Sequence, residues 1–170
     1  GLIAMQWARM MDVEITGTVS SEEKKELAKN HGATNVINYA RENFVEKIRD
    51  ITQGRGVDVV FDSVGASTFY QSIQSLKKYG LMVSYGNASG KVSAFDLGLL
   101  SGHLFITRPT LWSYVATRKE LEVTFGELLQ LVMLNKIRIP IYQKKPLQDV
   151  VALHKLMEER RTTGCSILTV

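Results

Sequence analysis

The sequence predicts an α/β fold built on a doubly wound parallel sheet, and two observations carry that prediction. The apolar run within residues 57–62 is short, β-branched and continuous rather than alternating, which is typical of a strand buried on both faces. In addition, strand-like segments alternate with helical segments long enough to cross between parallel strands. We therefore expect helices on both faces of one parallel sheet.

The first two thirds of the chain follow this alternation closely. Ser20 or Ser21, followed by Glu22 and Glu23, predicts a helix N-terminus because acidic residues complement the helix dipole there. The predicted helices span residues 2–11, 20–29, 43–53 and 66–79, and the predicted strands span residues 13–19, 33–39, 57–62, 80–86 and 103–107.

The last third departs from the alternation. We predict a long helix over residues 117–135, a β-like segment over 137–142 around Pro140, a helix over 147–161 and a strand over 166–170. These pieces have few predicted partners in the chain, so we expect some of them to belong to a second domain. The expected division is a partial nucleotide-binding domain at residues 1–135 and a returning C-terminal segment at 136–170.

Composition excludes several classes of function. The net charge of +4 is spread along the chain without a basic patch, so we expect no nucleic-acid partner, although a multiply anionic small ligand is compatible with it. No apolar run approaches the roughly 20 residues of a membrane span. We expect a cytoplasmic protein without disulfides, because Cys165 is the only cysteine. His31, His103 and His154 lack partners at ligand spacing, so no metal site is expected.

The predicted strand at 57–62 ends in Asp62-Ser63-Val64-Gly65. Ligands of open parallel sheets bind beyond the carboxyl ends of the strands, where small and polar residues let a ligand approach the backbone. The alternative interpretation is a simple turn into the next helix. The residues alone leave both interpretations open.

The predicted strand at 13–19 bears on cofactor choice. A site for NAD places Asp or Glu at this strand end to bind the ribose 2′-hydroxyl, whereas a site for NADP replaces the acid with cations and hydroxyls. The chain has Gly17-Thr18-Val19-Ser20-Ser21 here, with Lys24 one turn later. The missing acid favours NADP, and the alternative is that Lys24 is an ordinary solvated helix residue.

Several runs together resemble the NADPH:quinone oxidoreductases, which include zeta-crystallin and form a zinc-independent branch of the medium-chain dehydrogenases/reductases. These runs are Val36-Ile-Asn-Tyr39, Asp58-Val-Val-Phe-Asp-Ser-Val-Gly65, Gly80-Leu-Met-Val-Ser-Tyr-Gly-Asn87 and Phe105-Ile-Thr-Arg-Pro109, with Arg160 and Gly164 near the end. The resemblance covers essentially the whole chain and implies a Rossmann-like fold. It also implies that a GroES-like catalytic domain and the first strand would precede residue 1.

The resemblance implies an NADPH site whose residues come from several strand ends. Gly1 would end the pyrophosphate loop, Ser20, Lys24 and Tyr39 would surround the adenosine 2′-phosphate and adenine, and Ser63 and Gly65 would line the crevice. Toward the nicotinamide would lie Tyr85, Gly86, Asn87, Phe105, Ile106 and Thr107, and Arg160 would return to the cofactor from the C-terminal segment. No catalytic residue is assigned within the chain.

The activity implied by the family is hydride transfer from NADPH to a quinone or a related electron-poor enone. Three alternatives stand beside it: an enoyl- or acrylate-type reductase, an NADPH-binding module without turnover, and a truncated remnant that is weakly stable and inactive alone. The family also implies a homodimer joined through His103–Thr107. Two departures from the family pattern are Asp12-Val13 in place of Gly-Ala after the first helix, and a shorter loop over 100–103.

Overall fold

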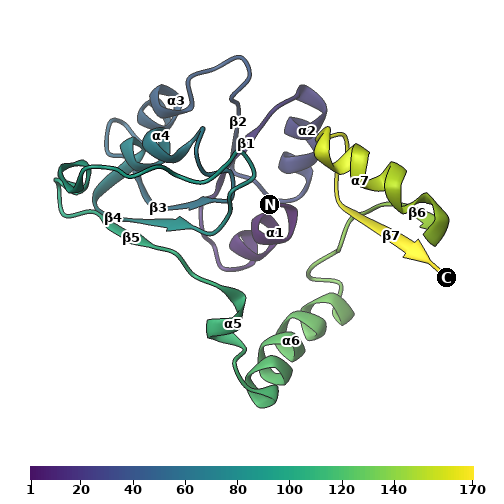
Figure 1. Ribbon diagram of the computed structural model, residues 1–170. Coiled ribbons are helices and arrows are strands. Elements are labelled where there is room, and N and C mark those ends of the chain that lie inside the picture. Colours follow the sequence, from purple (N-terminus) through teal and green to yellow (C-terminus); the bar gives the residue numbers. More distant parts are fainter. The chain divides into compact units, whose positions relative to one another are not determined.

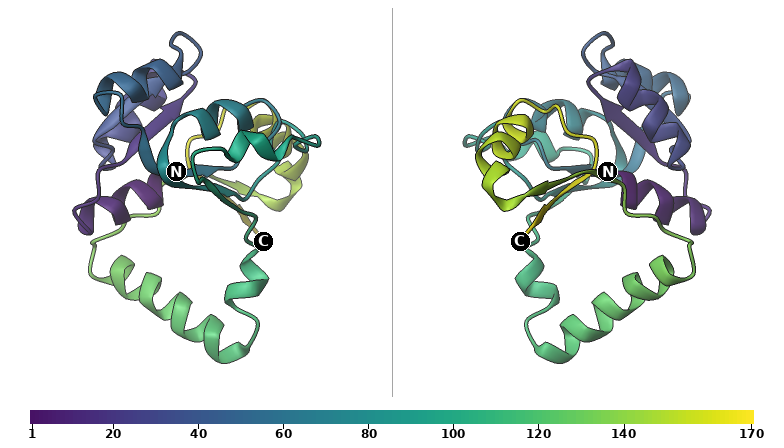
Figure 2. Two further views of the ribbon diagram at one scale, coloured as in Figure 1. Left: turned by 90° about the vertical axis from the view of Figure 1, so that its left-hand side faces the viewer. Right: turned by 90° about the vertical axis from the view of Figure 1, so that its right-hand side faces the viewer.

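The computed structural model describes residues 1–170, and every strand pair in it is parallel. The strands form three sheets rather than one, as Figures 1 and 2 show. These sheets are β1 (Thr16–Val19) with β2 (Asn35–Asn38), then β3 (Val57–Asp62) with β4 (Leu76–Ser84) and β5 (Phe105–Thr107), and finally β6 (Ile141–Pro146) with β7 (Cys165–Thr169). The predicted α/β class with parallel strands is confirmed.

Most helices lie where the sequence predicts them. They are α1 (Leu2–Met10), α2 (Glu22–Asn30), α3 (Phe44–Ile51), α4 (Phe69–Gln74), α5 (Leu111–Tyr114), α6 (Arg118–Met133) and α7 (Val150–Glu158), with 3-10 turns η1 (Leu97–Leu100) and η2 (Leu147–Asp149). The predicted cap of α2 is confirmed, since Ser21 Oγ accepts a hydrogen bond from the Lys24 amide at 3.2 Å. None of these helices is long and apolar enough to cross a membrane.

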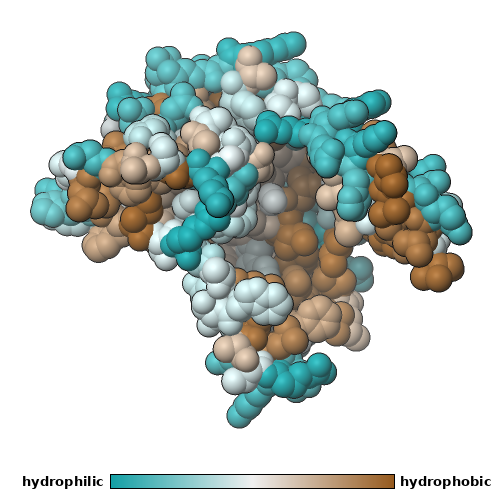
Figure 3. All heavy atoms as spheres, in the orientation of Figure 1, coloured by the Kyte–Doolittle hydropathy of each residue, from teal (hydrophilic) through white to brown (hydrophobic).

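Helix α6 begins with a reciprocal capping box. The Thr117 amide donates to Glu120 Oε2 at 2.8 Å, and the Glu120 amide donates to Thr117 Oγ1 at 3.2 Å. The hydrogen bond from the Thr117 amide is the main cause that lowers the pKa of Glu120. The helix has no buried residue, and hydrophobic surface lies over it in Figure 3.

The chain divides into two compact units, each with its own buried side chains. The first unit is Gly1–Ala40 with Phe125–Val170, and the second is Arg41–Thr124. In the first unit α2 packs on β1 and β2, and the buried apolar side chains are Met5, Ala28, Ile37, Ile137 and Leu153. The division into domains at residue 135 stays a prediction, because the two compact units follow packing within this chain alone.

The core of the second unit lies between its sheet and α4. Phe69 and Ile73 of α4 are buried against Met82 of β4, and Phe95 and Ile106 pack around them. Figures 1 and 2 both show α4 along one face of the three strands. Because the side chains of a strand alternate between faces, this helix can cover only alternate residues of β3.

The prediction that β3 is buried on both faces is wrong. Val60 and Asp62 are partly or fully covered, whereas Val59 and Phe61 are exposed, Phe61 by 71%. Strand β3 is also hydrogen-bonded to β4 alone, so its other edge is unpaired, and β1 likewise has only β2 as a partner. The continuous apolar run shows that both faces can be buried, but it does not provide the elements that would bury them.

The predicted helix over residues 66–79 is wrong in its second half. Helix α4 ends at Gln74, and Leu76 already pairs with Val57 as the first residue of β4. Between this pair and the next, Val59 with Leu81, the register shifts, and Tyr79 has a positive φ of 64°. A cross-strand ion pair between Lys77 and Asp58 accompanies this irregularity. Pairing with β3 thus overrides the local helical pattern.

The C-terminal predictions are largely confirmed, with one shift. The terminal strand is β7, and the helix predicted at 147–161 consists of η2 followed by α7. The β-like segment predicted at 137–142 begins later, as β6, because Pro140 precedes the strand instead of lying within it. The Pro140 carbonyl accepts a hydrogen bond from the Cys165 amide at 2.8 Å, so Pro140 ties β6 to β7 without donating.

The turn after α1 holds a left-handed residue that is not glycine. Asp12 has φ 53° directly after the C-cap residue Met11. Glycine is favoured at this position because a side chain adds strain there. We therefore expect Asp12→Gly to raise the free energy of unfolding by about 1 kcal/mol, as measured by urea denaturation. Asp12→Ala is the control, and it should destabilise the protein because alanine tolerates this φ less well than aspartate does.

Candidate functional site

The carboxyl end of β3 is organised by one buried carboxylate. Asp62 is 4% exposed, and its Oδ1 accepts from the amides of Val64 and Gly65 at 2.7 and 3.0 Å. Its Oδ2 accepts from Thr68 Oγ1 and Ser72 Oγ, both at 2.8 Å. Both oxygens are thereby satisfied, which a buried carboxylate requires. Residues 62–65 therefore do form a turn into α4, held by this carboxylate.

The turn after β4 packs directly on the turn after β3. The Ala88 and Ser89 amides donate to the carbonyls of Ser63 and Val64 at 3.2 and 2.7 Å, and the Ala66 amide donates to the Gly90 carbonyl at 3.2 Å. We call residues 62–66 and 85–90 together the double turn. It joins the carboxyl ends of two adjacent parallel strands, the edge at which ligands of open α/β sheets bind.

Two glycines make this close packing possible. A Cβ at Gly86 would lie 2.2 Å from the Ser63 carbonyl oxygen, and a Cβ at Gly65 would lie 2.7 Å from the Gly90 carbonyl oxygen. Gly65 also has φ 88°, which favours glycine. The space that the sequence interpretation reserves for a ligand at Gly65 is thus occupied by the neighbouring turn in this structure.

Arg108, the residue after β5, is fixed against the double turn by neutral acceptors. Its Nη1 donates to the Gly86 carbonyl at 3.0 Å and to Ser84 Oγ at 3.3 Å. The hydrogen-bond network orients the Asn87 amide so that its oxygen accepts from Arg108 Nη2 at 3.2 Å. Arg108 forms no ion pair, so its positive charge is held in place without a counter-charge.

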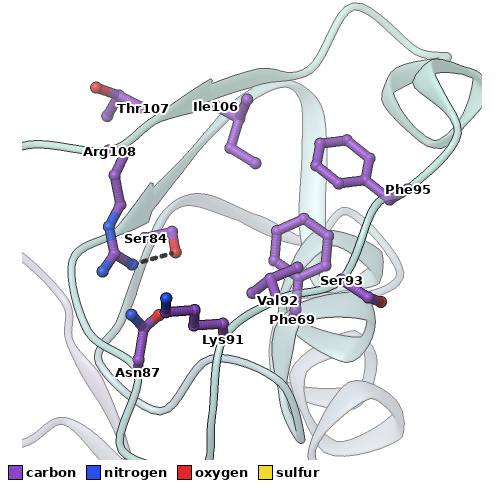
Figure 4. Close-up of a pocket in the computed structure, with 10 residues that line it drawn as sticks. All are labelled: Phe69, Ser84, Asn87, Lys91, Val92, Ser93, Phe95, Ile106, Thr107 and Arg108. Carbon is purple, nitrogen blue, oxygen red and sulfur yellow. Dashed lines mark hydrogen bonds between the residues drawn. The ribbon is translucent and has the colours of Figure 1, made fainter.

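A pocket of about 490 Å³ opens beside Arg108 within the second unit. Figure 4 shows two different ends: Arg108, Lys91 and Asn87 meet at one, and aromatic and aliphatic side chains form the other. The residues that line it are Phe69, Ser84, Asn87, Lys91, Val92, Ser93, Phe95, Ile106, Thr107 and Arg108. No carboxylate is among them, so the pocket is cationic at one end and apolar at the other.

A second group of predicted site residues gathers in the first unit. The Tyr39 amide donates to the Val19 carbonyl at 3.0 Å, which places Tyr39 beside the end of β1. Lys24 Nζ donates to the Arg160 carbonyl at 2.6 Å, and Arg160 has φ 59° at the turn after α7. Two cationic residues that lie far apart in the sequence are therefore adjacent here.

The carboxylate of Glu22, near this group, already has partners. Glu22 Oε1 accepts from Asn38 Nδ2 at 2.7 Å, and its other oxygen lies 3.9 Å from Lys25 Nζ. Neither Lys24 nor Arg160 forms an ion pair. Serine hydroxyls therefore follow β1 in the sequence, and the Lys24 ammonium lies against the backbone of Arg160.

The predicted site residues fall into separate places. Ser20, Lys24, Tyr39 and Arg160 lie in the first unit, and Gly1 lies there as the N-cap residue of α1. In the second unit the structure brings Ser63, Gly65, Gly86 and Asn87 together in the double turn, and Asn87, Ile106 and Thr107 line the pocket. Tyr85 and Phe105 are half exposed and do not line it.

The two cations of the pocket, Arg108 and Lys91, are not among the site residues predicted from the sequence. Arg108 directly follows a strand of a parallel sheet, and this position is the signal that could have found it. Lys91 follows the double turn without any comparable local signal. Only the packing of one turn on the other brings it to the same pocket.

The chain does not assemble a metal site. No group of three or more His, Cys, Asp or Glu side chains is arranged to hold an ion.

Comparison with known proteins places the chain among dehydrogenases. The family model described as zinc-binding dehydrogenase matches residues 1–131. The chain is 43% identical over 99% of its length to quinone oxidoreductase 1 of Escherichia coli, and 40% identical over 99% to the 2-haloacrylate reductase of a Burkholderia species. It covers 53% and 51% of these proteins, so it spans about half the length of the curated relatives it matches.

Solved structures agree with the sequence matches. The crystal structure of Escherichia coli quinone oxidoreductase complexed with NADPH superimposes with a TM-score of 0.96, at 42% identity over 100% of this chain and 53% of that one. The structure of 2-haloacrylate reductase gives a TM-score of 0.89 at 38% identity, over 100% of this chain and 54% of that one.

The double turn depends on the carboxylate of Asp62, and this dependence can be measured. We expect Asp62→Ala to lower the free energy of unfolding by about 3 kcal/mol or more, since it leaves buried amides and hydroxyls without an acceptor. Asp58→Ala on the same strand is the matched control. Its side chain is exposed and pairs only with Lys77 at the surface, so the loss should stay below about 1 kcal/mol. Equal losses in thermal unfolding would contradict the assignment.

Proposed function

Since the chain belongs to the zinc-binding dehydrogenase family and matches quinone oxidoreductases along its whole length, we propose that it is the cofactor-binding portion of an NADPH-dependent oxidoreductase. The observation that carries this proposal is the juxtaposition of Lys24 and Arg160 at the end of β1, where no carboxylate ends the strand. The crystal structure of Escherichia coli quinone oxidoreductase with NADPH supports it.

On this proposal the residues of the first unit bind the adenosine end of the cofactor. Lys24, Arg160 and the hydroxyl of Ser20 surround the 2′-phosphate, and Tyr39 contacts the adenine. Gly1, at the N-terminus of α1, lies near the pyrophosphate, where unpaired helix amides attract anions. Ser63 and Gly65 line the cofactor crevice, and toward the nicotinamide lie Tyr85, Gly86, Asn87, Phe105, Ile106 and Thr107.

The proposed reaction is the reduction of a quinone or a related electron-poor enone without zinc. Bound NADPH supplies a hydride and becomes NADP⁺, and a proton from water completes the reduced product. The chain's own residues orient the cofactor and exclude water, and no acid–base catalyst is assigned among them. We propose this activity for the protein to which the chain belongs and expect the chain alone to be inactive.

A second candidate reaction is the reduction of an acrylate, and the similarity to 2-haloacrylate reductase favours it. Rates of NADPH oxidation with a simple quinone and with 2-chloroacrylate distinguish the two. Tight NADPH binding without oxidation by either acceptor would instead indicate a binding module without turnover. We propose a cytoplasmic location for each case.

We also propose that the protein forms a homodimer through β5. This strand is hydrogen-bonded to β4 on one side only, and Phe105 on it is 58% exposed. An uncovered apolar edge is a template for pairing with a second copy. We expect a dimer by light scattering and slow exchange of the Ile106 amide. A monomer in which this amide exchanges rapidly would contradict the proposal.

The role of Lys24 gives the sharpest test of the cofactor. We expect Lys24→Ala to weaken NADPH binding by roughly 1–2 kcal/mol, because it removes one charge-assisted contact with the phosphate, and to leave NADH binding nearly unchanged. Isothermal titration with each cofactor measures both. Lys25→Ala is the control, since Lys25 is the adjacent cation and faces Glu22. An equal loss for NADPH and NADH would show that Lys24 does not read the phosphate.

A further inference from the structure

We propose that the pocket beside the double turn binds the acidic group of a negatively charged, conjugated electron acceptor. Arg108 and Lys91 would bind its carboxylate or sulfonate, and the apolar end would hold its unsaturated body. That the ligand is an electron acceptor rests on the function proposed above. Binding of such an anion to the pocket does not depend on that function, and it can be tested separately.

The polar end of the pocket is positively charged. Arg108 and Lys91 both line the pocket, no Asp or Glu lines it, and neither cation forms an ion pair. Two adjacent positive charges without a counter-charge attract an anion more strongly in a partly desolvated pocket than at an open surface. A neutral quinone would leave both charges unpaired.

Arg108 is held in position by hydrogen bonds within the protein. Its contacts with the Gly86 carbonyl, Ser84 Oγ and the Asn87 amide oxygen hold the guanidinium in place, and these partners engage Nη1 and Nη2 while Nε has no partner. A planar guanidinium held by neutral acceptors loses little side-chain entropy when it binds a carboxylate. Figure 4 shows it at the same end of the pocket as Asn87 and Lys91.

The opposite end of the pocket suits a flat, unsaturated ligand. Val92, Phe95 and Ile106 are partly exposed along this wall, and the buried Phe69 packs behind Phe95 with ring centroids 5.0 Å apart. The volume of about 490 Å³ lies in the range of small-molecule sites. A compact inorganic anion would leave this wall bare, so the two ends together favour an organic anion with a conjugated body.

Binding is tested with 2-naphthoate and its neutral isostere 2-naphthamide, which have the same ring system and differ in charge. Titration calorimetry gives the dissociation constants, and methyl NMR shifts of Val92 and Ile106 report whether the ligand occupies the pocket. We expect about tenfold tighter binding of the naphthoate, and a preference that falls as salt is raised. Equal affinities, or shifts absent from both methyl groups, would overturn the proposal.

Substitutions of the two cations test whether they cause the preference for naphthoate over naphthamide. Lys91→Gln makes no change to the hydrogen bonds of the double turn and should reduce the preference severalfold. Arg108→Gln should abolish most of it, and Arg108→Lys, which keeps the charge, should restore part. Arg118→Gln is the matched control, because Arg118 is an exposed arginine of the same unit that pairs only with Glu122. An unchanged preference in both Lys91→Gln and Arg108→Gln would overturn the assignment.

Activity separates this inference from the proposed function. NADPH oxidation is compared with 1,4-naphthoquinone-2-sulfonate and with 1,4-naphthoquinone in the full-length protein. A higher rate with the sulfonate, reduced by Lys91→Gln, would support both the anion site and the oxidoreductase activity. Equal rates of NADPH oxidation with the two quinones would contradict an anionic acceptor but not the proposed oxidoreductase activity. Binding of 2-naphthoate without NADPH oxidation by either quinone would support the anion site and contradict the proposed oxidoreductase activity.

Discussion

The carboxylate of Asp62 accepts four hydrogen bonds where β3 passes into α4, and the carboxyl edge of the second unit depends on it. These bonds fix the positions of the Ser63 and Val64 carbonyls, which in turn receive the amides of Ala88 and Ser89. The turn after β4 is thereby placed, and its Gly86 carbonyl fixes Arg108. One buried acid, stable only because every acceptor site has a donor, thus determines where a cation lies two strands away.

The two units present the same electrostatic character at their carboxyl edges. In the first, Lys24 and Arg160 lie together at the end of β1, and in the second, Lys91 and Arg108 share the polar end of the pocket. None of these cations is neutralised by an ion pair. Positive charge is therefore present at both places where anionic ligands are proposed.

Local chemistry predicted well those features that depend on neighbouring residues. The Ser21 cap, the long helix α6 and the terminal strand β7 could be read from spacing and composition. The helix over 66–79 was mispredicted because pairing with Val57 draws Leu76 into a strand. Burial of β3 was mispredicted because an apolar run does not show which elements cover each face.

The candidate site was predicted only in part, because the local sequence does not show how distant segments pack against one another. The end of the predicted strand at 57–62 pointed to Ser63 and Gly65, the missing acid pointed to Lys24, and the family resemblance added Asn87. The role of Arg160 came from resemblance, and its adjacency to Lys24 was not predicted, since nothing local connects α2 to the turn after α7. Lys91 was missed because its place in the pocket depends on how one turn packs against another.

The double turn also bears on the order in which the second unit gains structure. The crossover from β3 to β4 covers only residues 63–75, shorter than the crossover of residues 85–104 that leads to β5. Closing the shorter loop loses less chain entropy, so β3, α4 and β4 come together at the lowest cost. The Asp62 hydrogen bonds join residues no more than ten positions apart. The anchor of the site thus belongs to the part of the unit that is easiest to form, and the cation from beyond β5 joins a scaffold that already exists.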